Sequence, residues 1–222
     1  MFWKNYYIVF DLETTGLWSH LNAICEIAII VLDNDLKEVE RYTHYVKTYK
    51  GKDNQLLKVE PQALQANGIS MKDVEEQGIE ASQLHKDLVA IFKKYKVGKY
   101  TLPILAGHNI FKFDLNFLIY LFDLFETPSA NGNSALYKYI EYAFDTQEFS
   151  RIKYGGVEVE NYQLGTVCRK HGITLVDAHR ALADTVANAK LFKKFVQEIR
   201  GGTKTIIETE IKKTKFRDIF KF

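Results

Sequence analysis

The chain has 222 residues, of which 46% are hydrophobic and 26% are charged, and its formal net charge is +2. This balance is typical of one globular domain with a substantial core, and it excludes an intrinsically disordered chain. A net charge so close to zero also excludes nucleic-acid binding through overall positive charge, so any such binding needs local basic groups.

Two cysteines, Cys25 and Cys168, each lie in an apolar pattern without a C-x-x-C motif, so we expect both to be reduced and buried. Lys4 and Asn5 interrupt the apolar residues at the N-terminus, and no apolar run approaches the roughly 20 residues that span a membrane. We therefore expect a soluble, cytoplasmic protein with no membrane partner.

Three strand patterns open the chain, at residues 6–13, 23–32 and 39–47, with a turn at 33–35 between the second and the third. The second pattern is strongly apolar. We expect the three strands to pair as a meander.

The first strand ends in two acids, Asp11 and Glu13, before a glycine turn. Alternate residues of a strand point to the same face, so the two carboxylates project together. Adjacent buried acids repel each other and lose hydration, a cost that a bound divalent cation removes. The pair therefore predicts a metal site; the alternative is a surface acid pair where a strand enters a loop.

A third acid, Asp114, stands at the front of a predicted helix. A helical stripe at residues 84–95 and a short buried strand at 104–106 precede it, and the helix itself is indicated by apolar residues at helical spacing: Leu115, Leu118, Ile119 and Phe122. The alternative role for Asp114 is helix capping, because the macrodipole favours an acid in the first turn.

Two further features lie between this helix and the last one. Residues 127–134 form the clearest loop, and we interpret it as an insertion near the active-site rim. Asn161 is the predicted cap of a helix that carries Leu164, Val167 and Cys168.

The last helix follows His179 and carries Asp184. It is indicated by a stripe at Leu182, Val186, Ala189, Phe192, Val196 and Ile199. On one continuous helix His179 and Asp184 would lie about 140° apart, so they could not share a site. We therefore predict that His179 lies in the loop just ahead of the helix; the alternative is an ordinary core or surface histidine.

These three segments resemble the DEDDh group of the DnaQ-like 3′→5′ exonucleases, which includes proofreading subunits and RNA-trimming enzymes. The matching segments are residues 10–17, 107–118 and 179–184, with weaker similarity at 66–70 and 144–146, so the resemblance spans roughly residues 6–199. One departure is the spacing from Asn109 to Asp114, which is five positions where many members have four. The order of the elements fits the α/β fold of this group, a ribonuclease-H-like mixed β-sheet with helices on both faces.

The resemblance implies a catalytic site of four metal-binding acids, Asp11, Glu13, Asp114 and Asp184, with His179 as the general base. Two cations about 3.5–4 Å apart can hold the attacking and leaving oxygens of a phosphodiester, and carboxylate ligands favour Mg²⁺ or Mn²⁺. The resemblance also implies that Thr14, Thr15 and Leu17 hold the terminal nucleotide.

Other substrate contacts have alternatives that the sequence leaves open. Trp18 either extends the base platform or packs its loop onto the sheet. Phe113 either stacks on a base or belongs to the core. Lys112 and Arg180 either bind phosphate or are solvated charges. His108 and Asn109 are candidate substrate contacts whose roles depend on the altered spacing.

The predicted function is a two-metal-ion 3′→5′ exonuclease that releases nucleoside monophosphates from single-stranded ends, with DNA favoured and replication or repair, through proofreading or end trimming, as its context. One alternative is an RNA-processing exonuclease, because both sugars fit the same phosphate chemistry. Another is a catalytically silent module that binds nucleic acid or a polymerase; the presence of all five catalytic residues argues against it.

We expect residues 1–200 to form the exonuclease domain and 201–222 a separate tail, with Gly201 and Gly202 breaking the last helix. The tail is basic and aromatic, so it is either a docking peptide for a polymerase or clamp, a strip that touches nucleic acid, or a segment that folds back onto the domain. Its basic and apolar residues are Lys212, Lys213, Lys215, Phe216, Arg217, Ile219, Phe220, Lys221 and Phe222.

Overall fold

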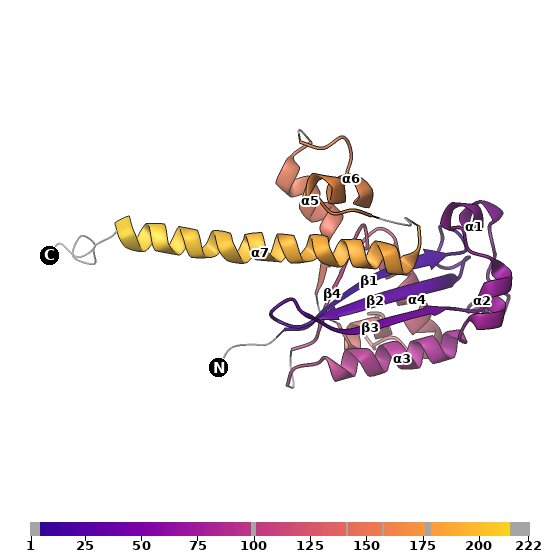
Figure 1. Ribbon diagram of the computed structural model, residues 1–222. Coiled ribbons are helices and arrows are strands. Elements are labelled where there is room, and N and C mark those ends of the chain that lie inside the picture. The colour runs from indigo at the N-terminus through magenta and orange to yellow at the C-terminus, as the bar shows by residue number, and fades with distance from the viewer. Residues whose placement is uncertain (1–4, 99–100, 141, 157, 176–178, 214–222) are drawn as a thin grey trace.

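The computed structural model describes residues 5–98, 101–140, 142–156, 158–175 and 179–213, with side chains as far as residue 201. Its centre is a five-stranded sheet in the order β3-β2-β1-β4-β5. The first three strands are antiparallel neighbours, whereas β1, β4 and β5 run parallel (Figure 1). The strands are β1 (Tyr7–Thr14), β2 (Ile24–Leu32), β3 (Glu38–Tyr45), β4 (Ile104–Gly107) and β5 (Ala143–Asp145).

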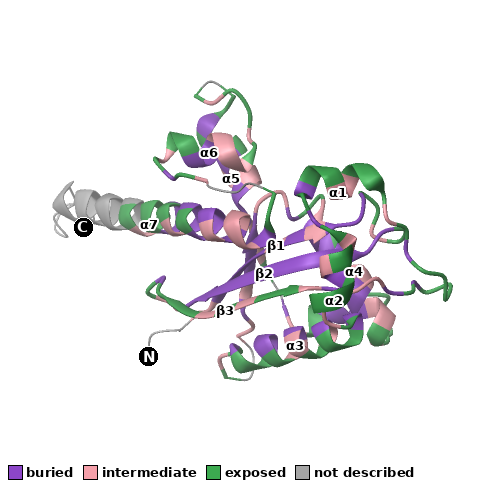
Figure 2. Cartoon of the chain, turned by 45° about the vertical axis from the view of Figure 1, so that its right-hand side comes forward, coloured by how far each residue is buried: buried purple, intermediate pink, exposed green. Residues whose placement is uncertain are grey.

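The hydrophobic pattern explains the place of each strand. All nine residues of β2 are buried, as expected for an apolar run with covered faces, and Figure 2 shows the strand in one burial class along its length. The β3 strand lies at the edge and has no buried residue. The predicted meander is confirmed.

Helices cover both faces of the sheet, as predicted. They are α1 (Pro61–Asn67), α2 (Met71–Gln77), α3 (Ala81–Lys94), α4 (Asp114–Phe125), the 3₁₀ turn η1 (Ala135–Lys138), α5 (Thr146–Tyr154), α6 (Leu164–Lys170) and α7 (Ala181–Lys213). The α7 helix lies across the sheet on one side, and α3 and α4 lie on the other (Figure 1).

The alternation along β1 decides which face carries the acids. Ile8, Phe10 and Leu12 belong to the core under α3 and α4, whereas Tyr7 and Val9 pack with α7. Because successive side chains alternate, Asp11 and Glu13 project to the α7 side.

The stripes predicted for three helices are confirmed in large part. Leu84, Leu88 and Phe92 of α3 are buried, and α4 begins at Asp114. Along α7, Ala189, Phe192 and Val196 are buried, but Ile199 is exposed. Both cysteines are free and buried, as expected.

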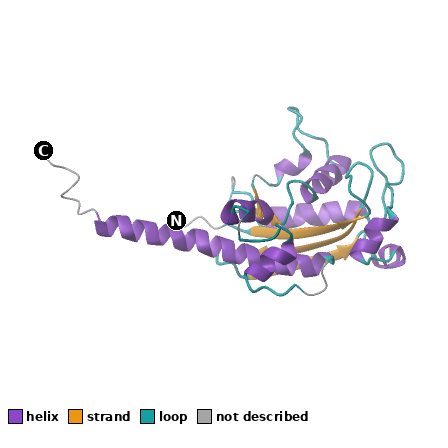
Figure 3. Ribbon diagram, turned by 90° about the horizontal axis from the view of Figure 1, so that it is seen from above, coloured by secondary structure: helices purple, strands orange, loops and turns teal. Residues whose placement is uncertain are grey.

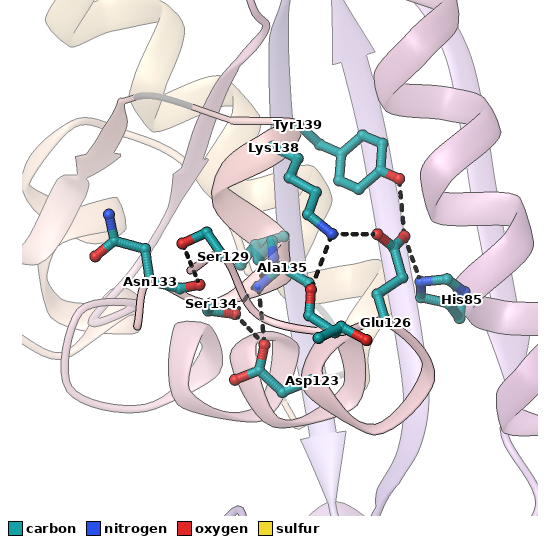
Figure 4. Close-up of polar contacts among 11 residues, drawn as sticks. His85, Asp123, Glu126, Ser129, Asn133, Ser134, Ala135, Lys138 and Tyr139 are labelled. Carbon is teal, nitrogen blue, oxygen red and sulfur yellow. Dashed lines mark hydrogen bonds and ion pairs between the residues drawn. The ribbon is translucent and has the colours of Figure 1, made fainter. Parts of the chain in front are cut away.

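The loop at residues 127–134 does not lie at the rim of the acidic site, so that prediction is wrong. Asp114 begins α4 and the loop follows its other end, about 16 Å away at 1.5 Å per residue. Glu126, at that end, contacts His85 of α3 at 3.1 Å, Lys138 at 3.1 Å and Tyr139 at 2.8 Å (Figure 4). The loop is therefore fastened to the α3–α4 layer.

Two predictions about helix ends are also wrong. Asn161 does not cap α6; its Oδ1 accepts the N–H of Gln163 in a turn before the helix, and Gln163 occupies the cap position. The pair Gly201 and Gly202 does not break α7, which continues to Lys213 and projects beyond the sheet (Figure 3). Each interior glycine costs only about 1 kcal/mol relative to alanine, which weakens a long helix without ending it.

The remaining predictions for the C-terminus are untested. Residues 214–222 and the side chains of 202–213 lie outside the description, and the division into a domain and a tail stays a prediction. Among the helices that the structure describes, none combines the length and the apolar character needed to cross a membrane. The cytoplasmic location likewise stays a prediction.

Candidate active site

The acids of β1 and α7 meet at one point. Carboxylate oxygens of Asp11, Glu13 and Asp184 lie within 4.8 Å of one another, and we call these three residues the carboxylate cluster. The end of β1 supplies two of them from alternate positions, and the first turn of α7 supplies the third. The structure therefore brings together three of the four acids that the sequence predicted as metal ligands.

The fourth acid, Asp114, lies beside the cluster. It is only 3% exposed, and its Oδ1 accepts the backbone N–H of Leu12 at 3.1 Å. Its charge is the largest charge contribution to the raised pKa of Asp11, after burial. Asp114 is not among the residues whose oxygens meet within 4.8 Å, so its carboxylate borders the cluster from the α4 side.

The carboxylates are electrostatically frustrated. Burial, followed by the charges of Asp184, Glu26 and Asp114, raises the pKa of Glu13 to about 8. Burial raises the pKa of Asp114 to about 7, and it raises the pKa values of Asp11 and Asp184 as well. Like charges crowded in a partly dry site favour the protonated form unless a cation compensates them.

Asp184 gives a direct test of whether a cation fits. Its Oδ2 accepts the backbone N–H of His179 at 3.1 Å, but its Oδ1 is buried and has no hydrogen-bond partner among the residues that the structure describes. A buried carboxylate oxygen without a partner is costly, and a hard divalent cation is the partner that an all-oxygen donor set suits. The carboxylate cluster therefore fits a divalent metal site.

His179 lies in the loop just before α7, as predicted. Its backbone has φ = 67°, in the left-handed region that residues other than glycine rarely adopt. Such strained conformations concentrate at functional sites. The side chain is exposed and the backbone N–H donates to Asp184, so the imidazole is accessible beside the carboxylates.

Arg180 is held by residues of the sheet, although its side chain remains 44% exposed, so its role as a phosphate ligand stays a prediction. Its guanidinium pairs with Glu26 of β2 at 3.1 Å and donates to the Tyr45 hydroxyl at 2.7 Å. Sequence reasoning missed Glu26, whose signal was an isolated acid inside the apolar run 24–32. Lys112 forms an exposed ion pair with Glu148 at 3.4 Å.

The turn after β1 is rigid. The hydroxyl of Thr14 donates to the carbonyl of Gly16 at 2.7 Å, and that of Thr15 donates to the carbonyl of Lys58 at 2.7 Å. A Cβ on Gly16 would lie 2.4 Å from the side chain of Asn22, so this turn requires glycine. The side chains of Thr14 and Thr15 are thus buried in the turn, which leaves mainly backbone to face a substrate.

Leu17 and Trp18 project from this turn. They are 73% and 62% exposed, so Trp18 does not pack its loop onto the sheet. An exposed leucine and tryptophan directly after the strand that carries Asp11 and Glu13 form an apolar surface suited to nucleobases. The structure leaves the platform role open and removes the packing alternative.

The segment before Asp114 is held by α5 and its preceding strand. His108 contacts the Thr146 hydroxyl at 2.9 Å through Nδ1 and the carbonyl of Tyr162 at 2.8 Å through Nε2. Both ring nitrogens of His108 are therefore engaged within the protein, and its substrate role stays a prediction. Burial lowers the pKa of His108, which favours the neutral ring.

The altered spacing after Asn109 is accommodated by a buried acid. Asn109 adopts φ = 64°, and Asp145 accepts the N–H groups of Asn109 at 2.9 Å and Phe111 at 3.2 Å. Phe113 is half-buried against the core and 5.1 Å from the ring of Phe117, which favours the core alternative.

Known proteins are similar to this chain in sequence and in fold. The family model RNase_T, described as "Exonuclease", matches residues 8–192. Ribonuclease T of Buchnera aphidicola subsp. Baizongia pistaciae is 31% identical over 198 residues, which cover 86% of this chain and 83% of that protein.

Two further similarities concern longer proteins. The PolC-type DNA polymerase III of Bacillus subtilis is 26% identical over 193 residues, but this chain covers only 11% of its length. The crystal structure of E. coli exonuclease I in complex with a dT13 oligonucleotide matches with a TM-score of 0.69 and 19% identity, over 88% of this chain and 42% of that one. The predicted ribonuclease-H-like fold is confirmed.

Proposed function

The chain belongs to the RNase_T exonuclease family, and from this we propose that it removes nucleoside monophosphates one at a time from the 3′ ends of single-stranded nucleic acid. One observation carries the proposal: Asp11, Glu13 and Asp184 converge within 4.8 Å, and one oxygen of Asp184 is buried without a partner among the described residues. Four acids that can bind metal ions and an accessible histidine are the groups that metal-assisted phosphodiester hydrolysis requires.

The acids and the histidine of the site have different roles in the proposed reaction. Asp11, Glu13 and Asp184 would hold two Mg²⁺ or Mn²⁺ ions, with Asp114 at the border of the cluster. When bound, the ions supply positive charge that favours deprotonation of water and stabilises the leaving oxygen. An imidazole nitrogen of His179 takes the proton from the attacking water, the role of a general base.

Leu17 and Trp18 orient the terminal nucleotide. Stacking on an aromatic side chain tolerates any base, as a sequence-independent exonuclease requires. Thr14 and Thr15 belong to the same rigid turn, and their side chains are buried in it. Their backbone holds the sugar, and Leu17 and Trp18 hold the base, next to the carboxylate cluster.

We propose DNA as the preferred substrate, supported by the similarity to a DNA polymerase and to an exonuclease I whose structure contains dT13. RNA is the second candidate, favoured by the 31% identity to ribonuclease T over most of that protein's length. The carboxylate cluster itself does not discriminate, because it acts on the phosphate that both polymers share.

Matched DNA and RNA oligomers with a label at the 3′ end test both points. We expect Mg²⁺- or Mn²⁺-dependent release of labelled mononucleotides, faster from DNA, and none from the Asp184→Asn variant. Release of the 3′ label only as part of a longer fragment would contradict exonuclease action. Binding without hydrolysis would support the silent-module alternative.

A further inference from the structure

Glu26 is a buried acid in the middle of an otherwise apolar strand. It is 4% exposed and lies directly opposite Glu13 in the register of β1 and β2. A buried carboxylate is costly unless it is paired and hydrogen-bonded, so its contacts indicate why an acid is placed there.

The contacts of Glu26 all lead to the start of α7. Its two oxygens accept from Arg180, through Nη2 at 3.1 Å and Nε at 3.3 Å. Glu26 Oε2 also accepts the backbone N–H of Ala181, the first residue of α7, at 3.2 Å. The carboxylate thus caps a helix that lies 155 residues away in the sequence, through one of the N–H groups that a helix leaves unpaired.

These bonds hold Arg180 and Ala181, the two residues that link His179 to the first turn of α7. On the other side, Asp184 accepts the backbone N–H of His179, so the turn is fastened at both ends. The left-handed backbone of His179 is unfavourable in isolation and persists only where its surroundings impose it. From the sheet, Glu26 contacts the two residues that follow His179, Arg180 and Ala181.

We propose that Glu26 is a positioning residue, which through Arg180 and Ala181 fixes the orientation of His179 and Asp184 relative to the carboxylates of β1. Its oxygens are occupied by these donors, which agrees with its absence from the carboxylate cluster. This inference rests on the proposed function, because it assigns tasks to His179 and Asp184 in hydrolysis.

The first test compares kcat and KM of Glu26→Gln and Arg180→Ala with those of the unmodified protein. We expect kcat to fall about 10- to 100-fold in Glu26→Gln, with KM nearly unchanged, because misplaced catalytic groups slow the chemical step. Arg180→Ala should also lower kcat, and it serves if the Glu26 variant does not fold, because this arginine is partly exposed. A rise in KM with kcat unchanged in both variants would overturn the proposal.

The pair of variants also separates positioning from a simple charge effect. Glu26→Gln removes a negative charge near the carboxylate cluster, whereas Arg180→Ala removes a positive one. Positioning predicts that both lower kcat, and a purely electrostatic effect predicts opposite directions. The matched control is Glu38→Gln, because Glu38 holds Arg41 through the same two nitrogens, at 2.9 and 3.1 Å, but on the exposed edge strand. It should leave kcat unchanged.

Amide hydrogen exchange in the metal-free protein provides a readout without activity. Loss of the cap should speed exchange at residues 179–184 by about 5- to 30-fold in Glu26→Gln, without a matching change in β4 or α3. Exchange at 179–184 equal to that of Glu38→Gln would overturn the proposal. An inactive unmodified protein with the expected exchange pattern would count against the proposed function and still support the positioning role.

Discussion

Leu12 donates its backbone N–H to Asp114 Oδ1 over 3.1 Å, joining two residues that are 102 positions apart. The pairing of β1 with β4 ends at Val9 and Ala106, so Leu12 lies beyond the last strand partner on that side. The carboxylate of Asp114 takes the place of a strand carbonyl there. Asp114 therefore holds the start of α4 against β1 as well as bordering the carboxylate cluster.

This double role distinguishes Asp114 from Asp11 and Glu13 when each acid is replaced. We expect Asp11→Ala, Glu13→Ala and Asp184→Ala to lower kcat by about 10³-fold or more, because each removes a metal-binding oxygen donor. The metal-free forms of Asp11→Ala and Glu13→Ala should keep or raise their melting temperature, since repulsion is relieved. Asp114→Ala should lose activity and also about 1–3 kcal/mol of stability, because the buried N–H of Leu12 loses its acceptor.

Denaturation of the four variants in EDTA measures this difference, and Glu76→Gln on the exposed face of α2 is the control for a lost surface acid. Near-normal turnover in saturating Mg²⁺ by any one of the four would remove that residue from the site. Equal stability of Asp114→Ala and Asp11→Ala would contradict the structural role of Asp114.

His179→Ala is expected to lower kcat by about 10²–10⁴-fold with little change in KM, because a general base acts in the chemical step. His108→Ala should instead lower the melting temperature and affect kcat far less, since both ring nitrogens of His108 bind other parts of the protein. Weaker substrate binding with unchanged kcat in His179→Ala would make His179 a substrate contact only.

Stability of the metal-free protein should fall as the pH rises. The pKa of Glu13 is raised from 4.5 to about 8, and that of Asp114 from 3.8 to about 7. At a pH between the unfolded and the folded pKa of each acid, the folded protein retains a proton that the unfolded chain has lost. The free energy of unfolding therefore decreases with increasing pH. Bound Mg²⁺ compensates the carboxylates, so its stabilising effect should be larger near pH 8 than near pH 5.

Urea denaturation over this pH range, with EDTA or with Mg²⁺, measures both effects. Glu13→Gln should reduce the slope of stability against pH, because it removes the group with the pKa of about 8. A metal-free stability that rises from pH 5 to 8 would show that the carboxylates are not frustrated.

The sequence correctly predicted those site residues whose position depends on local backbone geometry. The alternation of β1 placed Asp11 and Glu13 on one face, and the 140° separation on a helix placed His179 in a loop; both predictions are confirmed. The role of Glu26 was not predicted because its partners, Arg180 and Ala181, are far from it in the sequence, and no local pattern connects them. The predicted end of α7 at Gly201 and Gly202 was wrong because glycine lowers helix stability by only a small amount, while the helix gains stability from packing on the sheet.

Trp18 should matter for binding and not for folding. Trp18→Ala is expected to raise KM for single-stranded oligomers about 5- to 100-fold, the loss of one stacked base, with an unchanged melting temperature because the side chain is mostly exposed. Trp18→Phe should restore much of the affinity. Ile152→Ala, which removes a side chain 82% exposed on α5, is the control. A fall in melting temperature with unchanged KM would return Trp18 to a structural role.

The last prediction concerns removal of residues 203–222, which lie beyond the family match and include six basic and three acidic residues. The last buried residue of α7 among the described side chains is Val196, so we expect the shortened chain to keep its melting temperature and its hydrolysis of a mononucleotide ester. Binding to long strands should weaken, most strongly at low salt, because basic residues near a strand release counterions from its phosphates. A lower melting temperature would indicate that the segment folds onto the domain. If neither stability nor strand binding changes, a protein partner such as a polymerase or clamp becomes the favoured explanation, which pull-down with a peptide of residues 211–222 would test.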